Sequence, residues 1–94
     1  MEQIILNGEV LIPKYTKYSN GGICIELYTT TGKLYMVATT NIGNLKFADH
    51  YVGIKNWSEN AGVLEALIQA NIVKDPNIFV PSGFIEIPIC ELVK

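Results

Sequence analysis

The sequence predicts an α+β fold: a twisted antiparallel sheet of five or six strands with one helix packed on one face. Two observations support this prediction. Strand-like apolar segments separated by short turn sequences fill the first two-thirds of the chain, and a single segment, residues 58–70, has the apolar spacing of a helix. The chain has 94 residues, the size of one domain, so we expect residues 1–94 to form a single α+β domain.

The first hairpin is predicted at Asn7-Gly8, between strands over residues 2–6 and 9–13. Both central residues of a type I′ turn need a positive φ, which asparagine and glycine adopt readily. A further strand over residues 15–18 leads to a second turn at Asn20-Gly21-Gly22.

A third hairpin is predicted over residues 23–30 and 33–40, joined by the two-residue loop Thr31-Gly32. In that register Tyr28 lies opposite Tyr35, and Leu27 lies opposite Met36. Because side chains alternate along a strand, the core face would carry Ile23, Ile25, Leu27, Leu34, Met36 and Ala38. The opposite face would carry Cys24, Glu26, Tyr28, Tyr35 and Val37.

The helix over residues 58–70 is predicted from a core-facing stripe of Ala61, Leu64, Leu67, Ile68 and Ile72. Asn56 or Ser58 could cap its start, and with Asn56 as the cap Glu59 occupies the N3 position of a capping box. We expect Asn71 to end the helix in the left-handed conformation. A second stripe of small apolar residues, Val63, Ala66 and Ala70, would lie on a flank that the sheet need not cover.

The remaining elements are short. Residues 52–55 favour one more strand, residues 79–81 an extended piece, Ser82-Gly83 a turn and residues 84–93 a final strand. Pro88 lies inside this last strand and has no N–H to donate, so the strand should be an edge or carry a bulge there.

Composition excludes several classes of function. Seven basic and nine acidic residues give a net charge of −2, too little positive charge to hold a nucleic-acid backbone, so nucleic acid is not an expected partner. The two lysines around Lys14-Tyr15-Thr16-Lys17-Tyr18 are too few for a binding groove. No apolar run is long enough to span a membrane and no export signal is visible, so we expect a soluble, cytoplasmic protein.

The residues that could carry chemistry form no recognised motif. Cys24 and Cys90 are expected to be reduced, buried thiols, with a disulfide as the alternative if their strands are neighbours. His50 is the only histidine and is expected to be a loop residue without a chemical role. No metal-ligand spacing, nucleophile motif or phosphate-binding loop is present, so we expect no metal, no cofactor and no catalysis.

The C-terminal half resembles a known family. The residues that carry the resemblance are Asn56-Trp57-Ser58-Glu59-Asn60, then Leu64-Glu65-Ala66-Leu67, Pro81-Ser82-Gly83-Phe84 and Pro88-Ile89-Cys90-Glu91-Leu92. The family is a domain of unknown function in small bacterial proteins carried on phages, plasmids and conjugative elements. The resemblance covers about the last 45 residues and implies no reaction or cofactor. It implies a setting in which small proteins modulate host machinery or defence.

Two groups of residues are candidate binding sites. Tyr28, Tyr35 and Val37 would form an exposed recognition face, or simply a solvated sheet face with strand-favouring residues. Asn56, Trp57 and Glu59 would form a recognition surface at a helix N-terminus. Alternatively, they only cap the helix and fix it to the sheet, with Trp57 largely buried between the two.

The sequence thus suggests a non-catalytic binding protein of a phage or mobile element that inhibits or modulates a host protein, such as an anti-CRISPR-like anti-defence inhibitor. The alternatives are a protein that sequesters a small nucleotide signal in a pocket between subunits, and an enzyme of unrecognised type. Because charged residues make up only 17% of the chain, we also expect a homodimer joined through sheet edges, the tyrosine face or the helix flank.

Overall fold

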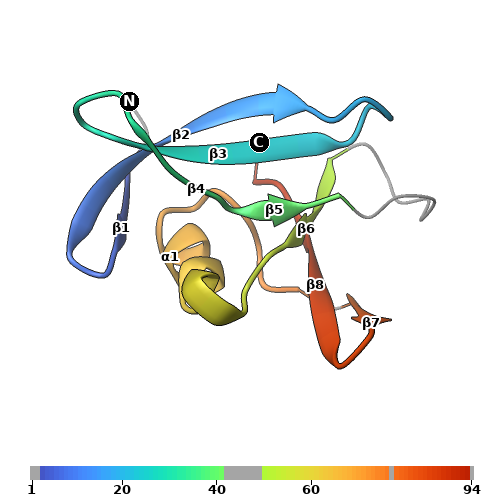
Figure 1. Ribbon diagram of the computed structural model, residues 1–94. Helices are drawn as coiled ribbons and strands as arrows, with labels where there is room; N and C mark the ends of the chain where they lie inside the picture. Colours follow the sequence, from blue (N-terminus) through green and yellow to red (C-terminus); the bar gives the residue numbers. More distant parts are fainter. Residues whose placement is uncertain (1–2, 42–49, 77, 94) are drawn as a thin grey trace.

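The computed structural model describes residues 3–41, 50–76 and 78–93, which form an α+β fold with two antiparallel sheets. Sheet A has the order β1-β2-β3-β4, with β1 at Ile4–Leu6, β2 at Glu9–Lys17, β3 at Ile23–Thr29 and β4 at Leu34–Val37. Sheet B has the order β5-β6-β8-β7, with β5 at Thr39–Thr40, β6 at Tyr51–Ile54, β7 at Ile78–Ser82 and β8 at Ile85–Glu91. Between β6 and β7 lie the 3₁₀ helix η1 at Ser58–Asn60 and the α-helix α1 at Val63–Gln69 (Figure 1).

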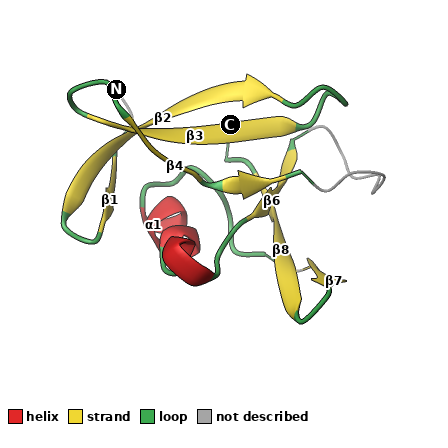
Figure 2. Cartoon of the chain, viewed as in Figure 1, coloured by secondary structure: helices red, strands yellow, loops and turns green. Residues whose placement is uncertain are grey.

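The α+β class is confirmed, but the single sheet of five or six strands is wrong. The described strands form two sheets of four, and both α1 and sheet B lie on the same side of sheet A (Figure 2). The core lies between these layers, where residues such as Leu11, Leu27, Ile54 and Leu67 are fully buried.

The division into two sheets takes place at Ala38, a fully buried residue between β4 and β5. Its N–H donates to the Ile25 carbonyl in sheet A (2.8 Å), whereas its own carbonyl accepts from the Lys55 N–H beside sheet B (2.8 Å). The Ile25 N–H therefore lacks a backbone acceptor and donates instead to Thr39 Oγ1 (3.2 Å). The Tyr18 hydroxyl hydrogen-bonds the same Thr39 oxygen at 3.0 Å. A side chain thus completes the hydrogen bonding that the strand gives up as it changes sheets.

The hairpin at Asn7-Gly8 is confirmed. Both residues have positive φ, 53° and 78°, and Leu6 pairs with Glu9 across a two-residue turn. The next two predicted strands are a single one, β2, which runs through Pro13. Proline is tolerated there because β1 begins at Ile4, opposite Leu11, so among the described strands Pro13 pairs only with β3.

The third hairpin has the predicted pairing in its middle but not at its loop. Leu27 pairs with Met36 as expected, whereas Tyr28 pairs with Leu34 and not with Tyr35. The loop has three residues, because the Thr29 N–H donates to the Lys33 carbonyl and Gly32 adopts a φ of 90°. A bulge between Leu27 and Tyr28 restores the register. As a result Leu34 is on the outer face and 53% exposed, which corrects its assignment to the core.

The predicted helix is two helices. Ser58–Asn60 is the 3₁₀ helix, and α1 starts only at Val63, because Gly62 at φ 93° interrupts the chain between them. The buried face of α1 holds Val63, Ala66 and Leu67, while Ala61 is exposed. The predicted core stripe is therefore partly wrong. The flank carrying Val63 and Ala66 packs in the core, so it is not a free surface for a dimer.

The C-terminal end of α1 is as predicted. Asn71 adopts φ 61°, its N–H donates to the Ile68 carbonyl (3.0 Å), and the Ile72 N–H donates to the Leu67 carbonyl (3.0 Å). These two bonds define a Schellman motif, and Leu67 and Ile72 are both buried in the core.

The strand that contains Pro88 is not an edge strand as predicted, but Pro88 itself has a strand partner on one side only. It lies in β8, one of the two central strands of sheet B, but the ladder between β6 and β8 covers only residues 89–91 of β8 and so does not reach Pro88. At Pro88 itself, β8 pairs only with β7, through Phe79. The missing N–H therefore interrupts no ladder.

Both cysteines are free and buried, Cys24 in sheet A and Cys90 in sheet B. Burial, with a smaller contribution from the Asp75 carboxylate, raises the pKa of the Cys90 thiol to about 12. The expectation of buried thiols is confirmed.

The first prediction concerns Thr39. Replacement Thr39→Val keeps the side-chain shape but removes the oxygen that accepts from the Ile25 N–H, leaving a buried donor unpaired. We expect unfolding in urea to show a loss of about 1–3 kcal/mol. Thr40→Val, at the half-buried neighbouring position, is the control and should cost less. Equal losses for the two variants would contradict the role given to Thr39.

The second prediction concerns Cys90. Its thiol has an ordinary pKa of 9.0 and a raised pKa in the fold, so the native protein holds this proton more tightly than the unfolded chain. Its contribution to stability is therefore complete below pH 9 and falls as the pH rises from 9 towards 12. We expect Cys90 to react slowly with a thiol reagent in the native protein and fully in denaturant. Rapid native labelling of Cys90, located by mass spectrometry, would refute this.

Candidate functional site

The surface of sheet A that faces away from α1 and sheet B carries an apolar patch across its four strands. Residues that pair across the strands share one face. The pairs Ile5–Val10, Ile12–Tyr28 and Tyr28–Leu34 therefore place these five residues together, and we call them the outer patch. Ile5 is 69% exposed, Leu34 53% and Val10 38%, whereas Ile12 and Tyr28 are half-buried.

A charged pair borders the outer patch. Lys14 of β2 pairs with Glu26 of β3, and Glu26 pairs with Val37 of β4, one step along the sheet from Tyr28. Lys14 Nζ lies 5.8 Å from the centre of the Tyr28 ring, and the Tyr28 hydroxyl donates to Glu26 Oε1 (3.0 Å). This hydrogen bond to a carboxylate raises the pKa of Tyr28 above its usual value of 10.0. Both charges are thus tied to the same tyrosine, whose ring they hold in place.

The structure changes the predicted tyrosine face. Tyr28 and Val37 lie on the outer face as expected, but Tyr35 has no cross-strand partner in the ladder, because the bulge sets Leu34 opposite Tyr28. Tyr35 is 39% exposed. Sequence reasoning missed Ile5, Val10, Ile12 and Leu34. The signal was present for the first three, since Ile5, Val10 and Ile12 alternate with the core residues Ile4, Leu6 and Leu11.

Asn56, Trp57 and Glu59 do not form the N-terminus of the main helix. Trp57 is half-buried, with an extended backbone, and immediately precedes η1. Asn56 Oδ1 accepts a hydrogen bond from the Leu64 N–H (3.1 Å), so Asn56 does cap α1, but from eight residues away. The side chain of Glu59 lies outside the described part of the structure.

A hydrogen bond connects this segment to the edge of β4. Asn60, which is buried, donates from Nδ2 to the Val37 carbonyl (2.9 Å) and so holds η1 against the edge of β4. The two candidate groups predicted from the sequence are therefore neighbours at that edge. The Asn56 and Asn60 side chains form hydrogen bonds that hold the fold together, so no ligand is needed to explain why asparagine occurs at these positions.

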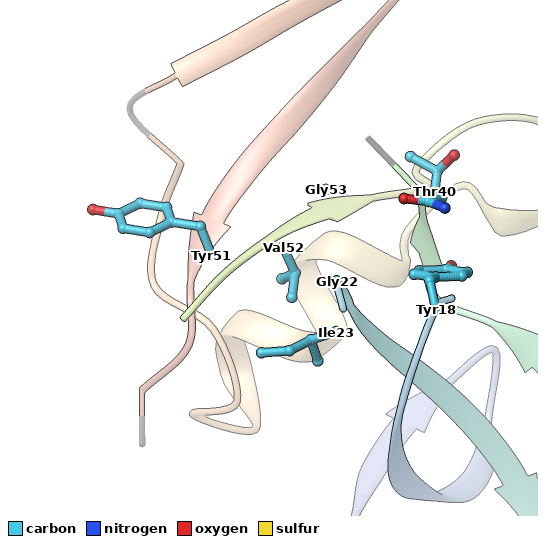
Figure 3. A pocket seen from close by; sticks show the side chains of 8 residues that line it. Tyr18, Gly22, Ile23, Thr40, Tyr51, Val52 and Gly53 are labelled. Carbon is cyan, nitrogen blue, oxygen red and sulfur yellow. The ribbon is translucent and has the colours of Figure 1, made fainter. Parts of the chain in front are cut away.

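A cleft opens where the two sheets meet (Figure 3). It is lined by Tyr18, Gly22, Ile23, Thr40, Asn41, Tyr51, Val52 and Gly53 and has a volume of about 30 Å³. Val52 points towards Ile23, while the Tyr51 ring points away from Tyr18. Burial raises the pKa of Tyr18, whose hydroxyl bonds Thr39 as described above. The cleft is large enough for ordered water but not for a nucleotide.

A second, more polar hollow of about 120 Å³ is lined by Tyr51, Lys74, Asp75, Ile78, Ile89 and Glu91. Beside it, His50 Nε2 lies 3.1 Å from Glu91 Oε2, and Lys74 Nζ lies 3.5 Å from Glu91 Oε1. His50 thus lies within hydrogen-bonding distance of a carboxylate 41 positions away in the sequence, which spacing alone could not reveal. These side chains are largely exposed, as in ordinary surface ion pairs.

Within residues 3–41, 50–76 and 78–93, no group of three or more histidine, cysteine, aspartate or glutamate side chains is placed to hold a metal ion. No helix in that same part of the chain has the length and apolarity to cross a bilayer. No family model, curated protein or solved structure matches the chain. The resemblance to a family of small bacterial proteins carried on mobile elements therefore stays a prediction.

The third prediction concerns the Tyr28–Glu26 hydrogen bond. We expect the Tyr28 phenol, followed by NMR as the pH is raised, to ionise above its usual pKa of 10.0. Glu26→Gln removes the negative charge and should bring the pKa of Tyr28 back towards that value, since the carboxylate is the main cause of the shift. An unchanged Tyr28 titration in Glu26→Gln would contradict the hydrogen bond.

Proposed function

We propose that this protein is a non-catalytic binding protein that recognises another protein through the outer patch. The observation that carries the proposal is the exposure of Ile5 and Leu34, at 69% and 53%, on one contiguous apolar surface. Soluble monomers seldom leave a large contiguous apolar patch in contact with water unless it binds something.

The composition of the patch favours a protein partner. An aliphatic centre with one tyrosine, bordered by an opposite-charge pair, matches the anatomy of protein interfaces, where aromatic anchors lie inside a polar rim. Lys14 and Glu26 give the rim both signs of charge. Tyr28 offers a large apolar ring whose position is fixed by both neighbours, which lowers the entropy lost on binding.

The shape of the surface supports the same conclusion. Small ligands bind in concave pockets of about 300–1,000 Å³. Three hollows on the described surface have volumes of about 30, 120 and 180 Å³, the last between β1 and α1. None of these three hollows is large enough for a nucleotide, which the alternative function, sequestration in a pocket between subunits, would have to hold.

The biological setting rests on the sequence resemblance. It suggests a protein of a phage or mobile element acting in the cytoplasm of a bacterial host, where its partner would be a host protein and the outcome inhibition, including inhibition of a defence system. Anti-defence activity is one form of this proposal, and the outer patch is the surface through which it would act.

The fourth prediction tests this surface. The double variant Ile5→Glu/Leu34→Glu places two charges in the outer patch. The matched control, Phe84→Glu/Val93→Glu, makes the same change at two exposed apolar residues elsewhere. From bacterial lysates, immobilised wild type and control should retain the same host protein, and the outer-patch variant should lose it. With the purified partner, the outer-patch variant should bind at least about 30-fold more weakly, because a hot-spot residue contributes about 2 kcal/mol or more.

Circular dichroism must show that both double variants remain folded. Equal retention by all three proteins, or no retained protein at all, would contradict the proposal. A nucleotide that co-purifies with all three would support the sequestration alternative. If the outer-patch variant alone changes the mass of the free protein in solution, the surface binds a second copy of the chain instead of a host protein.

A further inference from the structure

A second exposed apolar surface lies on the β7–β8 hairpin, at the end of sheet B remote from β5 (Figure 1). β7 is the edge strand, and its sequence from Ile78 to Ser82 contains no charged residue. Ile78 is 42% exposed and Phe79 52%, and Phe84 in the turn is fully exposed. Proteins usually protect edge strands with charges, short lengths or a covering element.

The other edge strands of the two sheets are better protected. β1 has three residues and β5 has two, whereas β7 has five. The edge of β4 is partly occupied, because Asn60 donates to the Val37 carbonyl. β2 also has an open edge beyond β1, at residues 12–17, but that stretch carries Lys14 and Lys17. Among these described edges, β7 is therefore the open one that lacks charged residues.

The ladder with β8 determines which backbone groups of β7 are open. Phe79 pairs with Pro88, and a proline cannot exchange N–H···O=C bonds with its partner. Phe79 and Pro88 are therefore a non-hydrogen-bonded pair, and the N–H and C=O of Phe79 point away from β8 towards the free edge. Its neighbours Ile78 and Val80 direct their backbone groups to β8.

Pro81 limits what this edge can bind. By the same alternation its backbone faces outward, but it contributes only a carbonyl. A long added strand needs alternating donors and acceptors along the edge, and Pro81 removes one of those donors. Phe79 is therefore the residue of β7 that has both its N–H and its C=O open. In an antiparallel pair, two residues of this kind, one from each strand, can exchange two N–H···O=C hydrogen bonds.

We propose that two copies of the chain pair through β7, antiparallel, about a two-fold axis at Phe79. Each Phe79 N–H then donates to the Phe79 carbonyl of the second copy. These two bonds use both open groups of Phe79 and do not need the donor that Pro81 lacks. The two-fold axis sets Phe79 opposite its own copy, and since β7 has no charged residue, the two strands meet without like-charge repulsion.

The same pairing covers the exposed side chains. It places the two Phe79 rings opposite each other on one face and Ile78 beside Val80 of the second copy on the other. Since an aromatic side chain has about 150–250 Å² of surface, a 52% exposed Phe79 contributes roughly 100 Å² per copy. Interfaces below about 1,200 Å² are typical of weak, transient complexes. The dimer should therefore form reversibly, at high protein concentration.

The test is a charge exchange at the two-fold axis. Sedimentation equilibrium of the wild type, from about 10 μM to about 1 mM to cover weak association, should show the mass rising from 10.4 kDa towards twice that value. Phe79→Glu and Phe79→Lys should each remain monomeric, because like charges meet across the axis. An equimolar mixture of the two should dimerise again, since the axis then brings opposite charges together. Such rescue requires both variants to be folded and residue 79 to face its own copy.

Phe84→Glu is the matched control, since it charges an equally apolar, exposed residue of the same hairpin outside the paired strand, and it should dimerise as the wild type does. A wild type that stays at 10.4 kDa throughout would overturn the proposal, as would a dimer unaffected by Phe79→Glu or a mixture that stays monomeric. The inference does not depend on the proposed function: loss of the host protein in outer-patch variants and loss of the dimer in Phe79 variants are separate results on separate sheets.

Discussion

The fold depends on how one strand passes from sheet A to sheet B at Ala38 and Thr39. A strand that leaves its neighbour leaves backbone groups without partners, and in a buried position each such group is costly. Here the Ala38 carbonyl accepts a hydrogen bond from the Lys55 N–H, and the Thr39 hydroxyl replaces it as the acceptor for the Ile25 N–H. Tyr18, from the end of the β2 segment, bonds the same hydroxyl and fixes the crossing point from the other side.

Because of this crossing, the small chain builds its core between two sheets instead of on one face of a single sheet. α1 fills the space between them, held at its start by Asn56 and at its end by the Schellman motif around Asn71. The consequence for function is geometric. Sheet A has its core on one side only, and its other side carries Ile5, Val10 and Leu34 without another described element over it.

The two exposed apolar surfaces differ in how they can bind. The outer patch presents side chains on a flat face, with Lys14 and Glu26 at its border, so its specificity would come from shape and charge. The edge of β7 presents backbone groups, and the prolines at positions 81 and 88 decide which of them are open. The two prolines thus have different effects in the hairpin. Pro88 forms no backbone hydrogen bonds with Phe79, whose N–H and C=O therefore point to the free edge, and Pro81 lacks the N–H that would extend the row of open groups along that edge.

Local chemistry in the sequence determined the features that depend on a few adjacent residues. The turn at Asn7-Gly8 and the end of the helix at Asn71 follow from the residues that tolerate positive φ, and the pairing of Leu27 with Met36 follows from alternation. Tertiary structure decided what depends on distant partners. The division at Ala38 needs Lys55, the cap of α1 needs an asparagine eight residues before the amide that it caps, and the close contact of His50 needs Glu91. The outer patch shows both levels: alternation implies Ile5 and Val10, but only the three-residue loop and the bulge, which shift the register by one residue, turn Leu34 from the core to the outer face.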